Sequence, residues 1–441
     1  MKLAIKNRSI LLVFLILLSI LLIASLPFNI SNKLGENQEL DSLKNAGGNW
    51  SPYIEEFVGR FPISVFIGDV NNDGYNDIAT ANHYDYDVSV LLWNNLSDYW
   101  ILEYNLPVGI GPYAASIGDA DNDGDNDIVT TDWGSNNITI WPWNKPNNSW
   151  GIPISRPGGF HPRGICIEDV NNDGFKDIIT ANDYVDVVVI HIWNSSLNDY
   201  NSPIYRLVGI NPWNVVVNDA NNDGFNDILT TDAVNNEVVI LLWNQVTEDW
   251  DIRIDKSIEF VPLWVFVGDA NNDGFNDVVT ANYGSNTISI LLWDDILSDW
   301  SQEVRKNTTS FPKSVSVGDV NNDGYNDIVA TNSEALVVSV FLWNVGDNSW
   351  DDQVLLSVAG KPNTIFIGDA NNDGYNDIIT NHDGRNSVSI ILWNPNIHNG
   401  RRPSPLPFEL LMIVGGLSLI AVLIIISMLV ILRNRRMRDI K

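Results

Sequence analysis

The sequence predicts an all-β protein, a seven-bladed β-propeller built from four-stranded blades. Three observations predict it: a unit that recurs every 50 residues, seven copies of that unit, and short apolar runs separated by turn residues. The β-branched and aromatic content of these runs favours strands over helices. Because most runs are apolar at consecutive positions, both faces of each sheet must be covered, and blades repeated around an axis provide that cover.

Each unit is marked by four features that keep the same 50-residue step. In the first copy, Pro62 precedes an apolar run that leads into an acidic loop beginning at Asp69. A second run follows the loop, a third ends at Trp93, and a fourth opens at Trp100. Seven copies at one spacing do not arise by chance, and a fixed period of this length is typical of propellers and solenoids.

The count of strands predicts how the ring closes. Strands of the fourth kind begin near residues 50, 100, 150, 200, 250, 300 and 350, whereas the loop-bearing sets run from residue 62 to residue 394. No fourth strand follows Trp393. Residues 50–58 are therefore predicted to complete the last blade.

The acidic loop has the spacing Asp-x-Asn-x-Asp-Gly-x-x-Asp, which matches a calcium loop at positions 1, 3, 5, 7 and 9. Position 7 would contribute its backbone carbonyl, and Gly74 supplies the positive φ that lets the chain wrap an ion. Oxygen ligands in this number suit calcium better than zinc or copper. Three carboxylates around one point repel each other unless a cation is present. We expect up to seven structural Ca²⁺ ions; the other interpretation is a series of Asn-Asp-Gly turns without metal.

The predicted ligand positions in the seven loops are Asp69, Asn71, Asp73, Tyr75, Asp77; Asp119, Asp121, Asp123, Asp125, Asp127; Asp169, Asn171, Asp173, Phe175, Asp177; Asp219, Asn221, Asp223, Phe225, Asp227; Asp269, Asn271, Asp273, Phe275, Asp277; Asp319, Asn321, Asp323, Tyr325, Asp327; and Asp369, Asn371, Asp373, Tyr375, Asp377.

The segment 68–80, Gly-Asp-Val-Asn-Asn-Asp-Gly-Tyr-Asn-Asp-Ile-Ala-Thr, resembles the FG-GAP/VCBS repeat. That repeat builds the seven-bladed propeller of integrin alpha subunits and of many microbial surface proteins. The resemblance covers about residues 50–394. It implies calcium at Asp69, Asn71, Asp73 and Asp77 and at their equivalents in the other six loops.

Charge and cysteine content exclude several classes of partner and site. The chain has 55 acidic and 25 basic residues, and its net charge is −30. Such a body repels nucleic acid and anionic membrane surfaces, so we expect no nucleic-acid partner. A single cysteine excludes a disulfide framework and a cysteine-based zinc site.

The two ends of the chain predict a membrane-anchored, extracellular propeller. Residues 1–28 have basic residues before an apolar run and are predicted to be a signal peptide or a signal anchor. Residues 410–432 are apolar and uncharged, long enough for a transmembrane helix, and the basic tail 433–441 places the C-terminus in the cytoplasm. Linkers at 29–49 and 396–409 flank the propeller at 50–395. Sequons at Asn49, Asn95, Asn137, Asn147, Asn194 and Asn307 make it a candidate glycoprotein.

The variable connections between strands are predicted to lie on the propeller face opposite the acidic loops. Aromatic residues there, beside Asp, Asn and Arg, are typical of sugar or protein recognition. The candidates are Tyr84, Tyr86, Trp133, His161, Arg163, Tyr184, Trp213, Trp264 and Tyr283. The other interpretation is that these rings only fill the mouth of the central channel.

The expected function is an adhesion or recognition module with an extracellular protein or glycan ligand. One alternative is a lectin-like carbohydrate binder. Another is a polysaccharide-processing enzyme such as a lyase, for which Arg163 with His161 is the one indication. No catalytic set emerges from the sequence, so we expect no enzyme.

Overall fold

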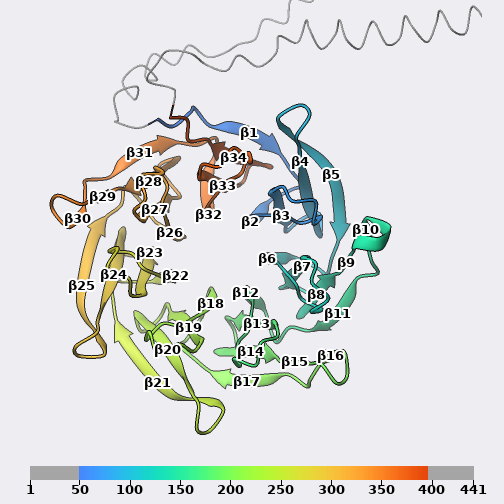
Figure 1. Cartoon of the computed structure of the whole chain (residues 1–441), viewed down its shortest axis with the longest axis horizontal. Coiled ribbons are helices and arrows are strands. Elements are labelled where there is room, and N and C mark those ends of the chain that lie inside the picture. The colour runs from blue at the N-terminus through green and yellow to red at the C-terminus, as the bar shows by residue number, and fades with distance from the viewer. Residues whose placement is uncertain (1–48, 396–441) are drawn as a thin grey trace, which may run out of the picture. The chain divides into compact units, whose positions relative to one another are not determined.

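The computed structural model describes residues 49–395, which form seven four-stranded antiparallel sheets arranged in a ring (Figure 1). This confirms the predicted all-β, seven-bladed propeller. The segments predicted at 1–28, 396–409, 410–432 and 433–441, and all of the linker at 29–49 except its last residue, lie outside the described residues. Between residues 49 and 395 there is no helix with the length and apolar character needed to cross a bilayer.

The blades follow one another along the chain, and in each the first strand lies innermost in the ring (Figure 1). Blades 1 to 3 are β2 (Pro62–Gly68), β3 (Asp77–Asn82), β4 (Asp87–Asn94) and β5 (Tyr99–Pro107); β6 (Pro112–Gly118), β7 (Asp127–Asp132), β8 (Asn137–Trp141) and β11 (Ile154–Pro157); and β12 (Pro162–Glu168), β13 (Asp177–Asn182), β14 (Val187–His191) and β17 (Ile204–Leu207).

Blades 4 to 7 repeat the same order. They are β18 (Val215–Asn218), β19 (Asp227–Asp232), β20 (Glu237–Asn244) and β21 (Asp249–Ser257); β22 (Pro262–Gly268), β23 (Asp277–Asn282), β24 (Thr287–Asp294) and β25 (Asp299–Asn307); β26 (Val315–Gly318), β27 (Asp327–Asn332), β28 (Val337–Phe341) and β31 (Val354–Ser357); and β32 (Lys361–Gly368), β33 (Asp377–Asp383), β34 (Ser387–Ile391) and β1 (Ile54–Phe57).

In blades 2, 3 and 6 the outer hairpin continues as a short two-stranded ladder beyond an irregularity. These ladders are β9 (Trp143–Asn144) with β10 (Ser149–Trp150), β15 (Trp193–Asn194) with β16 (Asp199–Tyr200), and β29 (Trp343–Asn344) with β30 (Ser349–Trp350). The 3-10 turn η2 (Lys145–Asn147) connects the first of these pairs.

The last blade contains strands from both ends of the described chain. β1 runs antiparallel to β34, with Ile54 opposite Ile390 and Phe57 opposite Ser387. Trp50 also forms a bridge with Trp393. The sequence places a closing strand at residues 50–58, and β1 lies within that range as the outermost strand of the blade. The ring is thus closed by main-chain hydrogen bonds between its first and last strands.

The hydrophobic core lies between neighbouring blades. The second strand of a blade is buried along its whole length, as in β3 and β19. Each core cluster takes its residues from two neighbouring blades; Ile179 and Ile190 of blade 3, for example, pack with Val239 of blade 4. Burying one such side chain contributes about 1.5–3 kcal/mol. This two-sided burial is the physical reason for the continuous apolar runs.

A pair of aromatic rings joins the third and fourth strands of every blade. The rings meet edge to face, with centroids 4.9 Å apart for Trp93 and Trp100 and 4.9 Å apart for Trp50 and Trp393. Tyr200 replaces the second Trp in blade 3, at 5.1 Å from Trp193. Edge-to-face pairs add about 0.5–1.5 kcal/mol to the energy of burial. The two aromatic series of the sequence are therefore core residues of the blades.

Because the strands of a blade alternate in direction, its connections alternate between two faces of the ring. The acidic loops join first to second strands on one face, which we call the loop face. The connections from second to third strands, and from one blade to the next, lie on the other side, which we call the opposite face.

Deleting residues 50–58 should abolish cooperative unfolding, because blade 7 would lose its outer strand and the bridge between Trp50 and Trp393. Thermal melts followed by circular dichroism test this. Phe57→Ser is the matched control, since that side chain is 68% exposed in the same strand and its loss should leave the melt cooperative. A deletion variant that melts like the control would contradict the closure.

Candidate functional site

The acidic loops fold into a tight turn held by their own side chains. In the first loop the carboxylate of Asp69 accepts hydrogen bonds from the backbone N–H groups of Asp73, at 2.9 Å, and Gly74, at 2.8 Å. Asn71 accepts a second bond from the N–H of Asp73. Gly74 has a φ of +93°, a conformation that glycine adopts without strain. The oxygens at positions 1, 3 and 5 are therefore gathered around one turn.

The aspartate at position 9 is buried in every loop. In blade 1, Asp77 accepts backbone hydrogen bonds from Val70, at 3.2 Å, and from Trp93, at 2.8 Å. It therefore connects the start of the loop to the end of the third strand. The same bond to the aromatic residue's N–H is present in all seven blades, at Asp77, Asp127, Asp177, Asp227, Asp277, Asp327 and Asp377.

Burial raises the pKa of these position-9 carboxyl groups far above the ordinary value of 3.8. The pKa of Asp77 rises to about 7 and that of Asp127 to about 8. The backbone N–H groups that donate to these carboxylates lower the pKa, but by less than burial raises it. Neighbouring carboxylates of the same loop raise the pKa further. A buried carboxylate that remains charged at neutral pH needs a positive partner.

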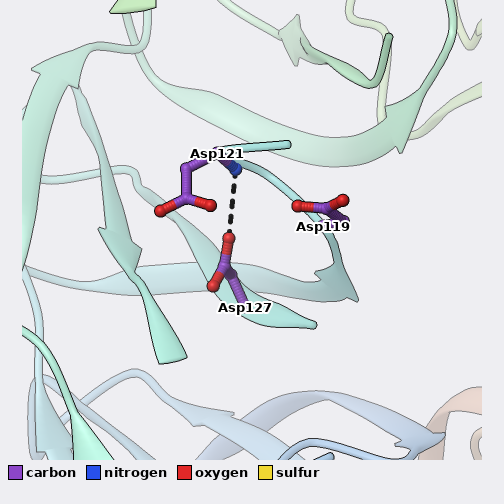
Figure 2. Close-up of side chains that lie close together, drawn as sticks. All are labelled: Asp119, Asp121 and Asp127. Carbon is purple, nitrogen blue, oxygen red and sulfur yellow. Dashed lines mark hydrogen bonds between the residues drawn. The ribbon is translucent and has the colours of Figure 1, made fainter. Parts of the chain in front are cut away.

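The second loop brings three carboxylates together, those of Asp119, Asp121 and Asp127 (Figure 2). One oxygen of each lies within 4.8 Å of the others. The backbone N–H of Asp121 donates to Asp127 at 3.1 Å (Figure 2). Oδ1 of Asp121 is buried and accepts no hydrogen bond from any described residue. Burial, followed by the charges of Asp123 and Asp119, raises the pKa of Asp121 to about 6.

These residues fit a hard divalent cation. The donors are carboxylate and amide oxygens at close range, the set that calcium prefers. The orphaned oxygen of Asp121 and the raised pKa values of the facing carboxyl groups both indicate negative charge without compensation. Asp125, at position 7 of this loop, has its own partner, Lys145, at 3.1 Å. Its side chain is thus separate from the three-carboxylate group.

Asparagine side chains connect each loop to the next one around the ring, and we call this set the asparagine belt. The side chain of Asn272, at position 4, donates to the carbonyl of Asn326 at 3.0 Å and accepts from its N–H at 2.6 Å. The side chain of Asn326, at position 8 of the next loop, donates to the carbonyl of Asp269 at 2.8 Å. The position-4 members are Asn72, Asn122, Asn172, Asn222, Asn272, Asn322 and Asn372.

The belt also connects loop 7 to loop 1, where the side chain of Asn372 accepts from the N–H of Asn76 and donates to its carbonyl. It has one irregular position, Lys176, which stands where the other loops have asparagine. Its backbone is held by Asn122, but its side chain pairs with Glu168. The belt was not predicted from the sequence. The recurrence of asparagine at positions 4 and 8 was the available signal, but partners about 54 residues away are visible only in the folded ring.

The nine candidates on the opposite face fall into three groups, and His83 and Tyr113, with ring centroids 6.5 Å apart, connect the first two. Trp133 and His161 stack at 4.1 Å between ring centroids, and Tyr184 lies 5.4 Å from His161. Tyr84 joins them through His83, and Tyr86 lies exposed in the same connection as Tyr84.

Arg163 and Trp213 form a second group. The guanidinium of Arg163 lies 3.9 Å from the ring centroid of Trp213 and 4.8 Å from that of Tyr113, and it pairs with Asp183. Its head group is therefore held on several sides.

The last two candidates lie apart from both groups. Tyr283 pairs with Phe311 at 5.0 Å, and Trp264 packs against the core between blades 5 and 6. The structure also adds residues to the opposite face that were not among the nine candidates: Phe61, His83, Tyr113, Phe160 and Asp183.

Comparison with known proteins supports the repeat and the fold. A model of the FG-GAP-like repeat matches residues 69–130, 119–180, 269–330 and 319–380, just over half of the chain. No curated protein matches.

Among solved structures, virginiamycin B lyase from Staphylococcus aureus is similar with a TM-score of 0.55 and 12% identity, over 78% of this chain and 99% of that one. BBS1N, solved in complex with ARL6DN, is similar with a TM-score of 0.54 and 10% identity, over 79% and 98%. Identities this low show the fold alone.

The belt predicts a reciprocal pair of substitutions. Lys176→Asn should raise the melting temperature, because an amide there can donate to the carbonyl of Asp119, and Asn326→Ala should lower stability by about 1 kcal/mol. Glu168→Gln is the control, since it breaks the exposed ion pair of Lys176, worth less than about 1 kcal/mol, without adding a belt bond. If Lys176→Asn melts no higher than this control, the belt bond contributes nothing.

The buried carboxyl groups predict an unusual pH dependence for the metal-free chain. Because their folded-state pKa of about 7 or 8 exceeds 3.8, the folded chain keeps protons that the unfolded chain has released. Stability in chelator should therefore be highest near pH 4 and fall as the pH rises through 7 and 8. Melting temperatures in chelator between pH 5 and 8.5 test this; a profile that is flat or rises would contradict it.

Proposed function

The chain belongs to the family of FG-GAP-like repeats, and from that premise we propose that it is a calcium-binding propeller that acts as a recognition module outside the cell. One Ca²⁺ per acidic loop would hold the loop face rigid, and the opposite face would bind an extracellular ligand. The predicted segments at 1–28 and 410–432 would export the propeller and anchor it in the membrane.

The observation that carries the calcium proposal is the group formed by Asp119, Asp121 and Asp127. Three carboxylates whose oxygens lie within 4.8 Å of one another, one with a buried oxygen that accepts no bond from the described residues, need a cation for stability. The other loops place asparagine at position 3, so each presents three carboxylates instead of four. We propose binding in the range of about 10⁻⁴–10⁻³ M, as for other extracellular modules.

The ions would act on structure, by holding together strands that meet at a corner. The aspartate at position 9 accepts a hydrogen bond from the end of the third strand, whereas positions 1, 3 and 5 lie in the turn. One ion bound by these positions would therefore connect the turn to the blade. The belt would then transmit that rigidity to the neighbouring loop. In this proposal the loop face is the frame and the opposite face carries the recognition.

Recognition is favoured over catalysis by the state of Arg163. Its ion pair with Asp183 and its contacts with Tyr113 and Trp213 hold the guanidinium in place as part of the packing near the ring's centre. The enzyme alternative rested on this residue together with His161. The fold similarity to a lyase adds no support, since a shared propeller does not carry an activity with it.

Chelator should lower the melting temperature of the full chain by more than about 10 °C. At a free calcium concentration ten times the Kd, seven sites together add about 10 kcal/mol to the free energy of unfolding. Calcium added back should restore it. Asp273→Asn should reduce the stoichiometry measured by equilibrium dialysis from seven to six, whereas Asp255→Asn, outside the loops, should leave it at seven. A melt that is insensitive to chelator would refute the calcium proposal.

A further inference from the structure

Seven aromatic side chains lie in an unbroken row on the opposite face, across blades 1, 2 and 3. We call this the aromatic row, and its members are Phe61, His83, Tyr84, Trp133, Phe160, His161 and Tyr184. Neighbouring ring centroids are between 4.1 and 6.5 Å apart, from Trp133 and His161 to His83 and Trp133. The sequence separates these residues by up to 123 positions, so the row exists only in the folded ring.

Three members of the row are exposed, and the other four are partly buried. Tyr184 is 71% exposed, Tyr84 54% and Phe160 42%. A shallow groove lined by Phe160, Val185 and Tyr205 adjoins its end on blade 3. Exposed rings gathered in one place are uncommon on a soluble surface and mark a binding site more often than single exposed rings do.

Polar groups without partners lie against the row. The carboxylate of Asp183 is 10% exposed, and one of its oxygens makes no hydrogen bond within residues 49–395, lying 3.9 Å from Nδ1 of His161. The indole N–H of Trp133 is likewise unpaired among the described residues. Both atoms are enclosed by neighbouring groups, so a ligand reaches them only where a side chain of the row moves aside.

The arginines beside the row are both paired, Arg163 with Asp183 and Arg60 with Asp85. Asp132 and Asp186, in the connections that bear Trp133 and Tyr184, accept hydrogen bonds from neutral groups. The surplus charge near the row is therefore negative, and it repels an anionic ligand but not a neutral one.

We propose that the aromatic row binds a neutral oligosaccharide. The C–H faces of pyranose rings pack on the electron-rich faces of Tyr84, Trp133 and Tyr184. Sugar hydroxyl groups hydrogen-bond the phenol groups of Tyr84 and Tyr184, whose side chains are exposed. The proposal rests on the proposed recognition function, and it is independent of calcium because no residue of the row belongs to an acidic loop.

The test uses the purified full chain and immobilised neutral tetrasaccharides: cellotetraose, chitotetraose, mannotetraose and xylotetraose. At least one should bind, and Tyr184→Ala should weaken that binding tenfold or more without a change in melting temperature, since this side chain is largely exposed. Trp133→Phe, which keeps a ring but removes the indole N–H, should weaken it less. Tyr99→Ala, at a tyrosine that is 46% exposed at the loop-face end of β5, should bind as the parent does.

Three results would overturn the proposal: no tetrasaccharide binds, Tyr184→Ala binds as tightly as the parent, or the row binds a protein ligand and no sugar. The last result would leave the recognition function standing and refute the chemical class. Repeating the measurement in chelator at a temperature below the metal-free melt separates the two proposals. Sugar binding that survives there leaves the row independent of the acidic loops, and sugar binding that is lost refutes that independence.

Discussion

A buried carboxylate at the ninth position of each loop holds the blade together at its most constrained point. In blade 1 that carboxylate, Asp77, accepts an N–H from the beginning of its loop and another from the end of the third strand. Two hydrogen bonds do not neutralise a full charge in an apolar surrounding, and the raised pKa of Asp77 expresses that deficit. The same bond from the third strand recurs in all seven blades.

The ring distributes this constraint around the whole propeller. Neighbouring blades share a hydrophobic core, and the asparagine belt adds polar contacts between their loops. The belt also passes from loop 7 to loop 1, at the same junction where β1 pairs with β34. The ring is thus closed twice at this junction, once by hydrogen bonds between strands and once by hydrogen bonds from an asparagine side chain to the backbone of the next loop.

The two faces of the propeller differ in how closely the blades repeat. On the loop face, all seven copies make the bond from the third strand to the position-9 aspartate, and the exceptions to the repeat are Asp121 and Lys176. On the opposite face, Tyr84, Trp133 and Tyr184 collect over blades 1 to 3, while Tyr283 and Phe311 form a separate pair near blades 5 and 6. The proposed ions would occupy the face that repeats, and the proposed ligand would occupy the face that does not.

The sequence by itself determined the propeller, its blade number and the loops, because a 50-residue period, a strand-length apolar pattern and ligand spacing are all local properties of the chain. It predicted Tyr84, Trp133, His161 and Tyr184 on the opposite face but could not order them in space. Only the tertiary structure decided that they form one row, that Arg163 is held between Tyr113 and Trp213, and that Asn272 reaches Asn326. The reason is that these contacts form between blades, where the distance between two side chains depends on the closure of the whole ring and not on their spacing along the chain.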